Sequence, residues 1–472
     1  MGQEEKDKKI GFKAKEAWLE MGETEKEEVF KFSKEYARFL SANKTEREFA
    51  TASVELLEQE GFKNLNTVDS LTSGDKVYSV NRKKEVIAFI VGKKSLTDGL
   101  YIVGSHIDSP RIDLKPDPLF EKKGMVFLDS HYYGGIKKYQ WVTIPLAIHG
   151  VLVKEDGQTI EISIGEEEDD PVFYISDLLI HLSDKQLKKK MSEAITGEQL
   201  NIMIGSIPLK DKDVKKEKVK AAILKLLEEK YEILAEDFIS ADLEVVPALK
   251  ARDVGFDRGL LAGYGHDDRV CSYAALRALL DMNQPEKTAM VLLMDREEIG
   301  SMGSTGMQSW FFENTVAQAI NLYYQEYNDL LLRKVLRNTR AISGDVSAAF
   351  DPGFREVFSE TNSAYLGKGI VLTKYTGSRG KAGASEATAE FMGKIRRLFN
   401  KNGILWQVGG LGKVDEGGGG TIAQFLANYS MDVVDIGPAL LSMHSPYEIV
   451  SKVDLYHAYL GYLVFLEQNI DN

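Results

Sequence analysis

Two adjacent carboxylates, Glu297 and Glu298, stand just after an apolar run and before a segment rich in glycine and serine. The run, Ala289–Met294, is typical of a buried parallel strand, and open α/β sheets bind ligands outside the carboxyl ends of their strands. Two neighbouring carboxylates can divide the work, one holding a metal ion and the other moving a proton. A solvated acidic turn is the competing interpretation of the pair alone.

Three further side chains of metal-ligand chemistry follow apolar runs in the same way. His106 ends one run, and Asp108 could orient its imidazole on a metal ion. Asp345 follows a second run and His444 a third. Taken singly, a capping acid and a structural histidine are the ordinary interpretations of such residues.

Asp267 and Asp268 precede a predicted helix in the sequence Gly-Tyr-Gly-His-Asp-Asp-Arg at 263–269. Either aspartate could cap the helix, or one carboxylate could bridge two ions by giving an oxygen to each. His266 is an alternative ligand, because spacing does not separate it from its neighbours.

The combined set holds histidines and carboxylates, and the only cysteine of the chain, Cys271, is not part of it. Such ligands suit a pair of zinc, cobalt or manganese ions. Two ions about 3.5–4 Å apart can activate a water and polarise a carbonyl oxygen. A glutamate beside a ligand glutamate would then carry the proton, so the pattern predicts metal-assisted hydrolysis. Serine-hydrolase and nucleotide-phosphate motifs do not match the chain.

Length and composition limit the remaining possibilities. A chain of 472 residues predicts two domains or one large domain with an insertion. The net charge of −13 argues against nucleic acid and anionic membranes as partners. A single cysteine excludes an intramolecular disulfide, and the charged amino terminus lacks the apolar core of a signal peptide. We therefore expect a cytoplasmic protein without a membrane span.

The order of predicted elements indicates an α/β fold with a mainly parallel central sheet flanked by helices. Strands are expected at 76–81, 86–91, 100–104, 288–295 and 341–344, and helices at 305–337 and 384–400, with a capping signal at Thr45. Between 113 and 251 short strand-like runs alternate with charge clusters. We predict a catalytic domain in two parts, 1–112 and 252–472, with 113–251 as a β-rich insertion.

The ordered motifs resemble the aspartyl aminopeptidase family of dinuclear zinc peptidases, which includes vacuolar aminopeptidase I. The resemblance covers most of the chain from about residue 100 onward. The matching motifs are Gly-Ser-His-Ile-Asp-Ser-Pro at 104–110, Tyr-Gly-Gly at 133–135 with Trp141, Asp-Asp-Arg at 267–269, Asp-Arg-Glu-Glu-Ile-Gly-Ser at 295–301, Ser-Gly-Asp at 343–345 and Met-His-Ser at 443–445.

This resemblance implies a ligand set for two divalent ions, zinc in the first place and cobalt or manganese as alternatives. It implies that His106 and Asp345 hold one ion. It implies that Glu298 and His444 hold the other, with Asp267 as the bridge.

The resemblance also implies roles outside the ligand set. Glu297 is expected to act as the general base and then as the acid, and Asp108 to orient the histidine ligand. The insertion is expected to be a dimerisation domain, and the dimers to assemble into a dodecamer that admits peptides. Lys374 is a candidate for binding the first side chain of the substrate, with an acidic or a neutral preference left open.

We predict a metalloaminopeptidase that removes the amino-terminal residue of peptides. Two alternatives remain at this point. One is a carboxypeptidase or amidohydrolase on the same dinuclear site, and the other is a non-catalytic assembly shell.

Overall fold

The structure is a computed structural model that describes residues 12–468 and 470. The chain forms two compact units, of which the second consists of Ser109–Lys250 and His444–Pro446 and the first of the remaining described residues. The unit boundaries therefore lie at 108/109 and 250/251, beside the predicted 112/113 and 251/252. The first boundary lies earlier because β5 (Arg111–Lys122) already pairs within the sheet of the second unit.

A nine-stranded sheet with the order β1-β2-β3-β13-β4-β14-β20-β16-β18 forms the centre of the first unit. Its middle strands β13, β4, β14 and β20 are parallel, while β3 and β16 pair antiparallel with their inner neighbours. This confirms the predicted α/β fold with a mainly parallel sheet. The strands are β1 (Lys63–Asn64), β2 (Lys76–Asn81), β3 (Glu85–Ile90), β13 (Ala289–Met294), β4 (Tyr101–His106), β14 (Arg340–Ser343), β20 (Asp432–Gly437), β16 (Ile370–Thr373) and β18 (Trp406–Val408).

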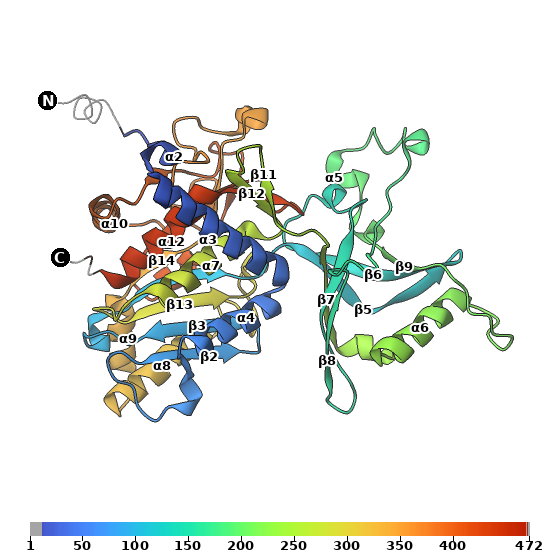
Figure 1. Cartoon of the computed structure of the whole chain (residues 1–472), viewed down its shortest axis with the longest axis horizontal. Coiled ribbons are helices and arrows are strands. Elements are labelled where there is room, and N and C mark those ends of the chain that lie inside the picture. Colours follow the sequence, from blue (N-terminus) through green and yellow to red (C-terminus); the bar gives the residue numbers. More distant parts are fainter. Residues whose placement is uncertain (1–11, 469, 471–472) are drawn as a thin grey trace. The chain divides into compact units, whose positions relative to one another are not determined.

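Helices cover both faces of this sheet (Figure 1) because the side chains of each strand alternate between two cores. In β13, Val291 and Leu293 join the core under one set of helices, and Leu292 joins the opposite core. The first set is α3 (Glu23–Ala42), α4 (Glu46–Gln59), α7 (His266–Asp281), α10 (Ala389–Lys401) and α12 (Lys452–Glu467). The second set is α8 (Phe311–Tyr324), α9 (Asp329–Asn338) and α11 (Ala423–Ala427).

Two predicted helices have different bounds in the structure. The helix expected at 384–400 begins at Ala389, because Thr388 accepts a hydrogen bond from the Phe391 amide at 3.2 Å and caps it there. The helical stretch expected at 305–337 is divided into α8 and α9, since Asn328 caps α9 in the same way. The Thr45 capping signal is confirmed at the start of α4.

A smaller five-stranded sheet completes the first unit, with β11 (Arg252–Val254), β12 (Leu260–Gly263), β22 (Glu448–Ser451), β21 (Ala439–Leu441) and β15 (Ser347–Ala348) in that order.

The second unit contains a six-stranded antiparallel sheet with the order β8-β7-β10-β5-β6-β9. Helix α6 (Lys218–Tyr231) packs on β5 and β6 of that sheet. No helix in the described part of the chain is long and apolar enough to cross a membrane. The other strands of this sheet are β6 (Met125–Tyr133), β7 (Leu146–Val153), β8 (Thr159–Ile164), β9 (Ile202–Gly205) and β10 (Ala241–Pro247).

Candidate metal centre

The carboxyl ends of three parallel strands bring the first candidate residues to one edge of the central sheet. His106 is the last residue of β4 and pairs in register with Met294, the last residue of β13. The chain leaves β13 directly into the segment that carries Glu297 and Glu298. Asp345 follows the end of β14, which pairs with the other side of β4. The paired strands thus bring the backbone positions of these residues, which are far apart in the sequence, to the same edge of the sheet.

Asp108 fixes the orientation of His106 and of the glutamate pair together. Its Oδ1 lies 3.2 Å from Nδ1 of His106, which also lies 3.0 Å from the Asp108 carbonyl oxygen. The same carboxylate accepts hydrogen bonds from the backbone amides of Glu297 at 3.1 Å and Glu298 at 3.2 Å. Nε2 of His106 therefore points the other way, 3.3 Å from Asp267 Oδ1 and 3.9 Å from Glu297 Oε2.

Asp267 and Asp268 occupy an irregular first turn of α7. Their backbone angles are not helical and the peptide bond between them is cis. The Asp267 amide donates to Oε2 of Glu448 on β22 at 3.0 Å, and both aspartates are buried. The Asp267 side chain is directed toward His106.

Ligand atoms converge in two groups that share Asp267. His106, Asp267 and Glu298 offer atoms within 4.8 Å of one another, and so do Asp267, Asp268 and Asp345. His106 and Asp267 are buried, whereas Glu298 and Asp345 keep partial exposure. A carboxylate common to two groups is what a bridge between two ions requires.

The electrostatics of this cluster fit a divalent cation. Removal from bulk water, with the neighbouring Asp268 and Glu297 carboxylates, raises the pKa of Asp345 well above its usual value. Burial raises the pKa of Asp268 in the same way. Burial alone would lower the pKa of His106, but hydrogen bonds with Asp108 and Asp267 raise it well above its usual value. Acids crowded at this density repel one another, and a bound cation would relieve the repulsion.

The other sequence candidates belong to neither of these two groups. His444 belongs to the second unit, where its Nδ1 lies 2.8 Å from the Gly135 carbonyl oxygen. This contact leaves Nε2 as the ring nitrogen for a metal. Lys374 is half exposed and pairs with Glu386 at 3.4 Å. His266, the alternative ligand, is buried with its Nδ1 2.9 Å from the Tyr36 hydroxyl and is in neither group.

Sequence reasoning missed two residues at this site. Glu448 holds the Asp267 amide, but its short strand carries no motif that would have identified it. The sequence predicts Asp268 only as a helix cap or as an alternative to Asp267 for the bridge. Its Oδ2 accepts from the His106 amide at 3.4 Å, so it joins β4 to the start of α7. The doubled aspartate was the only signal available for it.

The fold and the cluster define a metallohydrolase of the α/β zinc-peptidase type. A model of the aminopeptidase I zinc metalloprotease (M18) family matches residues 39–466, and the chain belongs to this family. A probable M18 family aminopeptidase 1 of Clostridium acetobutylicum is 53% identical over 456 residues, which cover 96% of this chain and 98% of that protein.

Solved structures agree with this assignment. The M18 aminopeptidase of Thermotoga maritima superimposes with a TM-score of 0.94 at 47% identity, over 97% of this chain and all of that one. The S. cerevisiae mApe1 dodecamer, at 23% identity, has the same fold with a TM-score of 0.73, over 92% of this chain and 96% of that one. The chain is therefore a metal-dependent aminopeptidase of a zinc family, as predicted, and the carboxypeptidase and assembly-shell alternatives are not supported.

Proposed function

We propose that this aminopeptidase holds two divalent ions, zinc in the first place, between five side chains. Asp267 supports this proposal as the bridge, because it belongs to both groups of ligand atoms. The division of the other ligands between the two ions follows the family resemblance, since within these groups His106 converges with Glu298 and Asp345 with Asp268. His106 and Asp345 would hold one ion, and Asp267 would bridge to the other. Glu298 and His444 would hold the second ion, with the Gly135 contact fixing the His444 ring.

When bound, the ions would act as Lewis acids that polarise the substrate carbonyl and lower the pKa of a water. Glu297 is the proton carrier in this proposal. Its carboxylate lies on the ligand side of His106 while its backbone amide is held by Asp108. It takes a proton from the attacking water and gives it to the leaving peptide nitrogen, so that the amine departs neutral. Asp108 keeps both His106 and the Glu297 backbone in position for these transfers.

The substrate would be a peptide with a free amino terminus, since an aminopeptidase must recognise that amine. We expect the zinc-loaded protein to hydrolyse anilides of Asp, Glu, Leu, Met or Lys and to leave the same compounds intact when their amine is acetylated. Initial rates on the matched pairs measure this. Equal rates on free and acetylated compounds would contradict the aminopeptidase assignment and favour an amidohydrolase.

Lys374 remains our proposal for the residue that selects the first side chain. Its present partner Glu386 also pairs with Lys381, at 3.0 Å. An acidic substrate side chain would replace Glu386 as the partner of Lys374. On the same anilides, Lys374→Ala should lower kcat/KM for Asp and Glu by about tenfold relative to Leu, the effect of about one good charged hydrogen bond. A uniform change across the panel would exclude Lys374 from this role.

We propose that the second unit forms the contacts between subunits and that dimers build a dodecamer. The S. cerevisiae mApe1 relative is a dodecamer. A segment of this unit exposes several large apolar side chains close together in the sequence, and such apolar patches often mark a surface that binds another protein. Ile180, Leu182 and Leu187 are 67%, 68% and 69% exposed, and Leu178 and Leu179 are also exposed. Burial against a second copy would remove this surface from water.

The Ile180→Asp/Leu182→Asp double variant is expected to shift the particle to a smaller assembly. Charged groups in the middle of an apolar interface stay desolvated and unpaired, which weakens association. Light scattering coupled to gel filtration gives the mass directly. Lys189→Asp, on the same segment but in a charged stretch, is the control that should keep the full mass. An unchanged mass for the double variant would place the interface elsewhere.

A cytoplasmic location is the last part of this proposal. It is supported by the single cysteine, Cys271, which is buried and excludes an intramolecular disulfide.

A further inference from the structure

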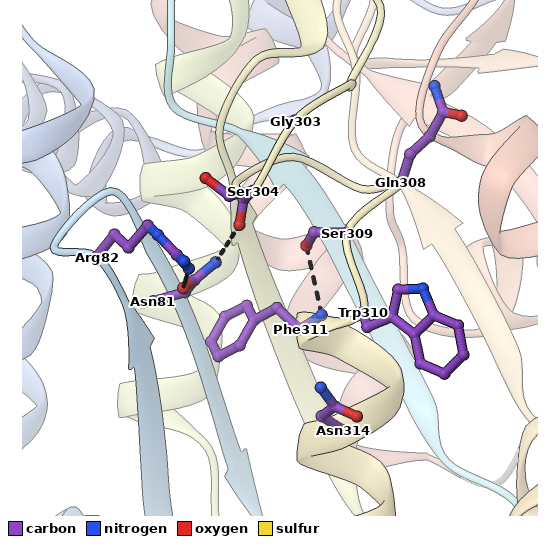
Figure 2. A pocket seen from close by; sticks show the side chains of 9 residues that line it. All are labelled: Asn81, Arg82, Gly303, Ser304, Gln308, Ser309, Trp310, Phe311 and Asn314. Atoms are coloured by element: carbon purple, nitrogen blue, oxygen red, sulfur yellow. Dashed lines mark hydrogen bonds between the residues drawn. The ribbon is translucent and has the colours of Figure 1, made fainter.

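A hollow of about 360 Å3 borders the loop that follows the glutamate pair. One wall is the β2–β3 turn with Asn81 and Arg82, and the other is formed by Gly303, Ser304 and the start of α8 (Figure 2). None of the proposed metal ligands lines it. Ser304 is exposed beside this hollow, whereas Thr305 and Gly306 are buried, and polar bonds hold this stretch of the loop.

The β2–β3 hairpin supplies these bonds. The Asn81 side-chain amide donates to the Ser304 carbonyl oxygen at 2.8 Å, as Figure 2 shows, and to Glu85 Oε2 at 2.7 Å. Oε1 of Glu85 accepts a hydrogen bond from the Gly306 amide. Asn81 and Glu85 face each other in register at the end of the hairpin. The two side chains therefore bind the loop at residues 304 and 306 from the same end of the β2–β3 hairpin.

Glu85 is unusual for a residue beside a turn, because it is fully buried. Burial raises its pKa to about 7, against the opposing effect of its hydrogen bonds with Asn81 and Gly306. Gly306 has φ +99°, and an added Cβ would lie 2.8 Å from the Ser301 carbonyl oxygen, so this approach requires glycine. The adjacent Lys84 pairs with the buried Glu46 of α4 at 2.8 Å, which anchors the hairpin to the helical layer.

Short bonds connect the held residues to the segment before the glutamate pair. The Thr305 hydroxyl donates to Asp295 Oδ2 at 2.6 Å and accepts from Nε of Arg296 at 2.8 Å. The Ser301 amide donates to the Arg296 carbonyl oxygen at 2.6 Å. Movement of residues 304–306 would thus displace Asp295 and Arg296, which lead directly into Glu297.

We propose that Glu85 is a positioning residue for Glu297, acting through Gly306 on the loop that carries the general base. The inference rests on the proposed role of Glu297. Glu85 touches neither the substrate nor the proposed ions. It holds the loop so that the Glu297 carboxylate stays close to His106. A small displacement of this carboxylate would lower the reaction rate without weakening substrate binding.

Glu85→Ala in the full-length, zinc-loaded protein tests the proposal. We expect kcat to fall about 10- to 100-fold with KM changed less than about threefold, because only transition-state positioning is lost. The zinc content should stay at the wild-type value. Amide hydrogen exchange should accelerate in peptides covering 299–308 and not across the rest of the first unit, which a general loss of stability would affect throughout.

Three further variants complete the design. Glu85→Gln keeps an acceptor for the Gly306 amide and should recover part of the lost kcat. Asn81→Ala removes the bond to Ser304 and should also lower kcat and accelerate exchange in 299–308. It provides a second test if Glu85→Ala does not fold. Lys83→Ala, at an exposed position of the same turn, should retain the wild-type kcat and exchange pattern.

A double variant separates this inference from the proposed function. In a Glu297→Gln background, Glu85→Ala should cause no further loss, since the positioned group is already absent. An equal further loss in that background, a wild-type kcat for Glu85→Ala, or faster exchange throughout the unit would overturn the role of Glu85. A Glu297→Gln protein with near-normal turnover would instead overturn the proposed function itself.

Discussion

Replacing Glu297 by Gln is expected to lower kcat by about a hundred- to ten-thousand-fold, the usual contribution of a general acid–base group. The amide keeps the size of the side chain and the Asp108 bond to the Glu297 backbone, but it cannot accept the proton of the attacking water. Metal content should not change, because Glu297 is not in either group of converging ligand atoms. Initial rates on aminoacyl anilides and metal analysis of the same preparation measure both effects.

The comparison needs an exposed glutamate of the same unit as a matched control. Glu416→Gln, at an exposed position outside the ligand groups, should leave kcat and metal content as in the parent protein. A Glu297→Gln protein that turns over anilides at a rate similar to this control would remove Glu297 from the proton transfer.

Asp267→Ala is expected to remove both metal ions and to abolish activity. Each proposed site loses its shared carboxylate, so the loss of affinity should exceed the about 10- to 100-fold typical of removing an outer partner of a metal ligand. Asp345→Ala offers the sharper contrast, since it takes a ligand from only one site. We expect it to retain about one ion per subunit, held by Asp267, Glu298 and His444.

Metal analysis after dialysis against trace zinc measures this difference. Asp184→Ala, an exposed acid of the second unit, is the control and should retain the full content. If Asp267→Ala and Asp345→Ala lose the same fraction of the metal, Asp267 does not bridge two ions.

Much of the site could be predicted because its residues end apolar strands. Val291 and Leu293 belong to an apolar run that predicts a buried strand, and both are buried in the core. Glu297 is therefore expected just beyond the end of β13. The same argument places His106 at the end of β4 and Asp345 after β14. Because parallel strands put their carboxyl ends at one edge, three segments separated by many residues could be assigned to one place.

The remaining residues of the site depend on contacts between distant segments of the folded chain, which local sequence patterns do not predict. Asp268 and Glu448 act through backbone amides, and such a bond leaves no trace in residue spacing. Glu85 lies in a strand in which every residue is buried, so its carboxylate could not be connected to Gly306 beforehand. His266 resembled a ligand in sequence, but its ring is directed to the Tyr36 hydroxyl.

Diffraction from zinc-loaded crystals at the zinc absorption edge tests the central claim most directly, since it locates each ion without assuming its ligands. We predict two anomalous peaks per subunit, about 3.5–4 Å apart, with an Asp267 oxygen on each and His444 beside one of them. A single peak, or peaks away from Asp267, would contradict the dinuclear site and the mechanism built on it.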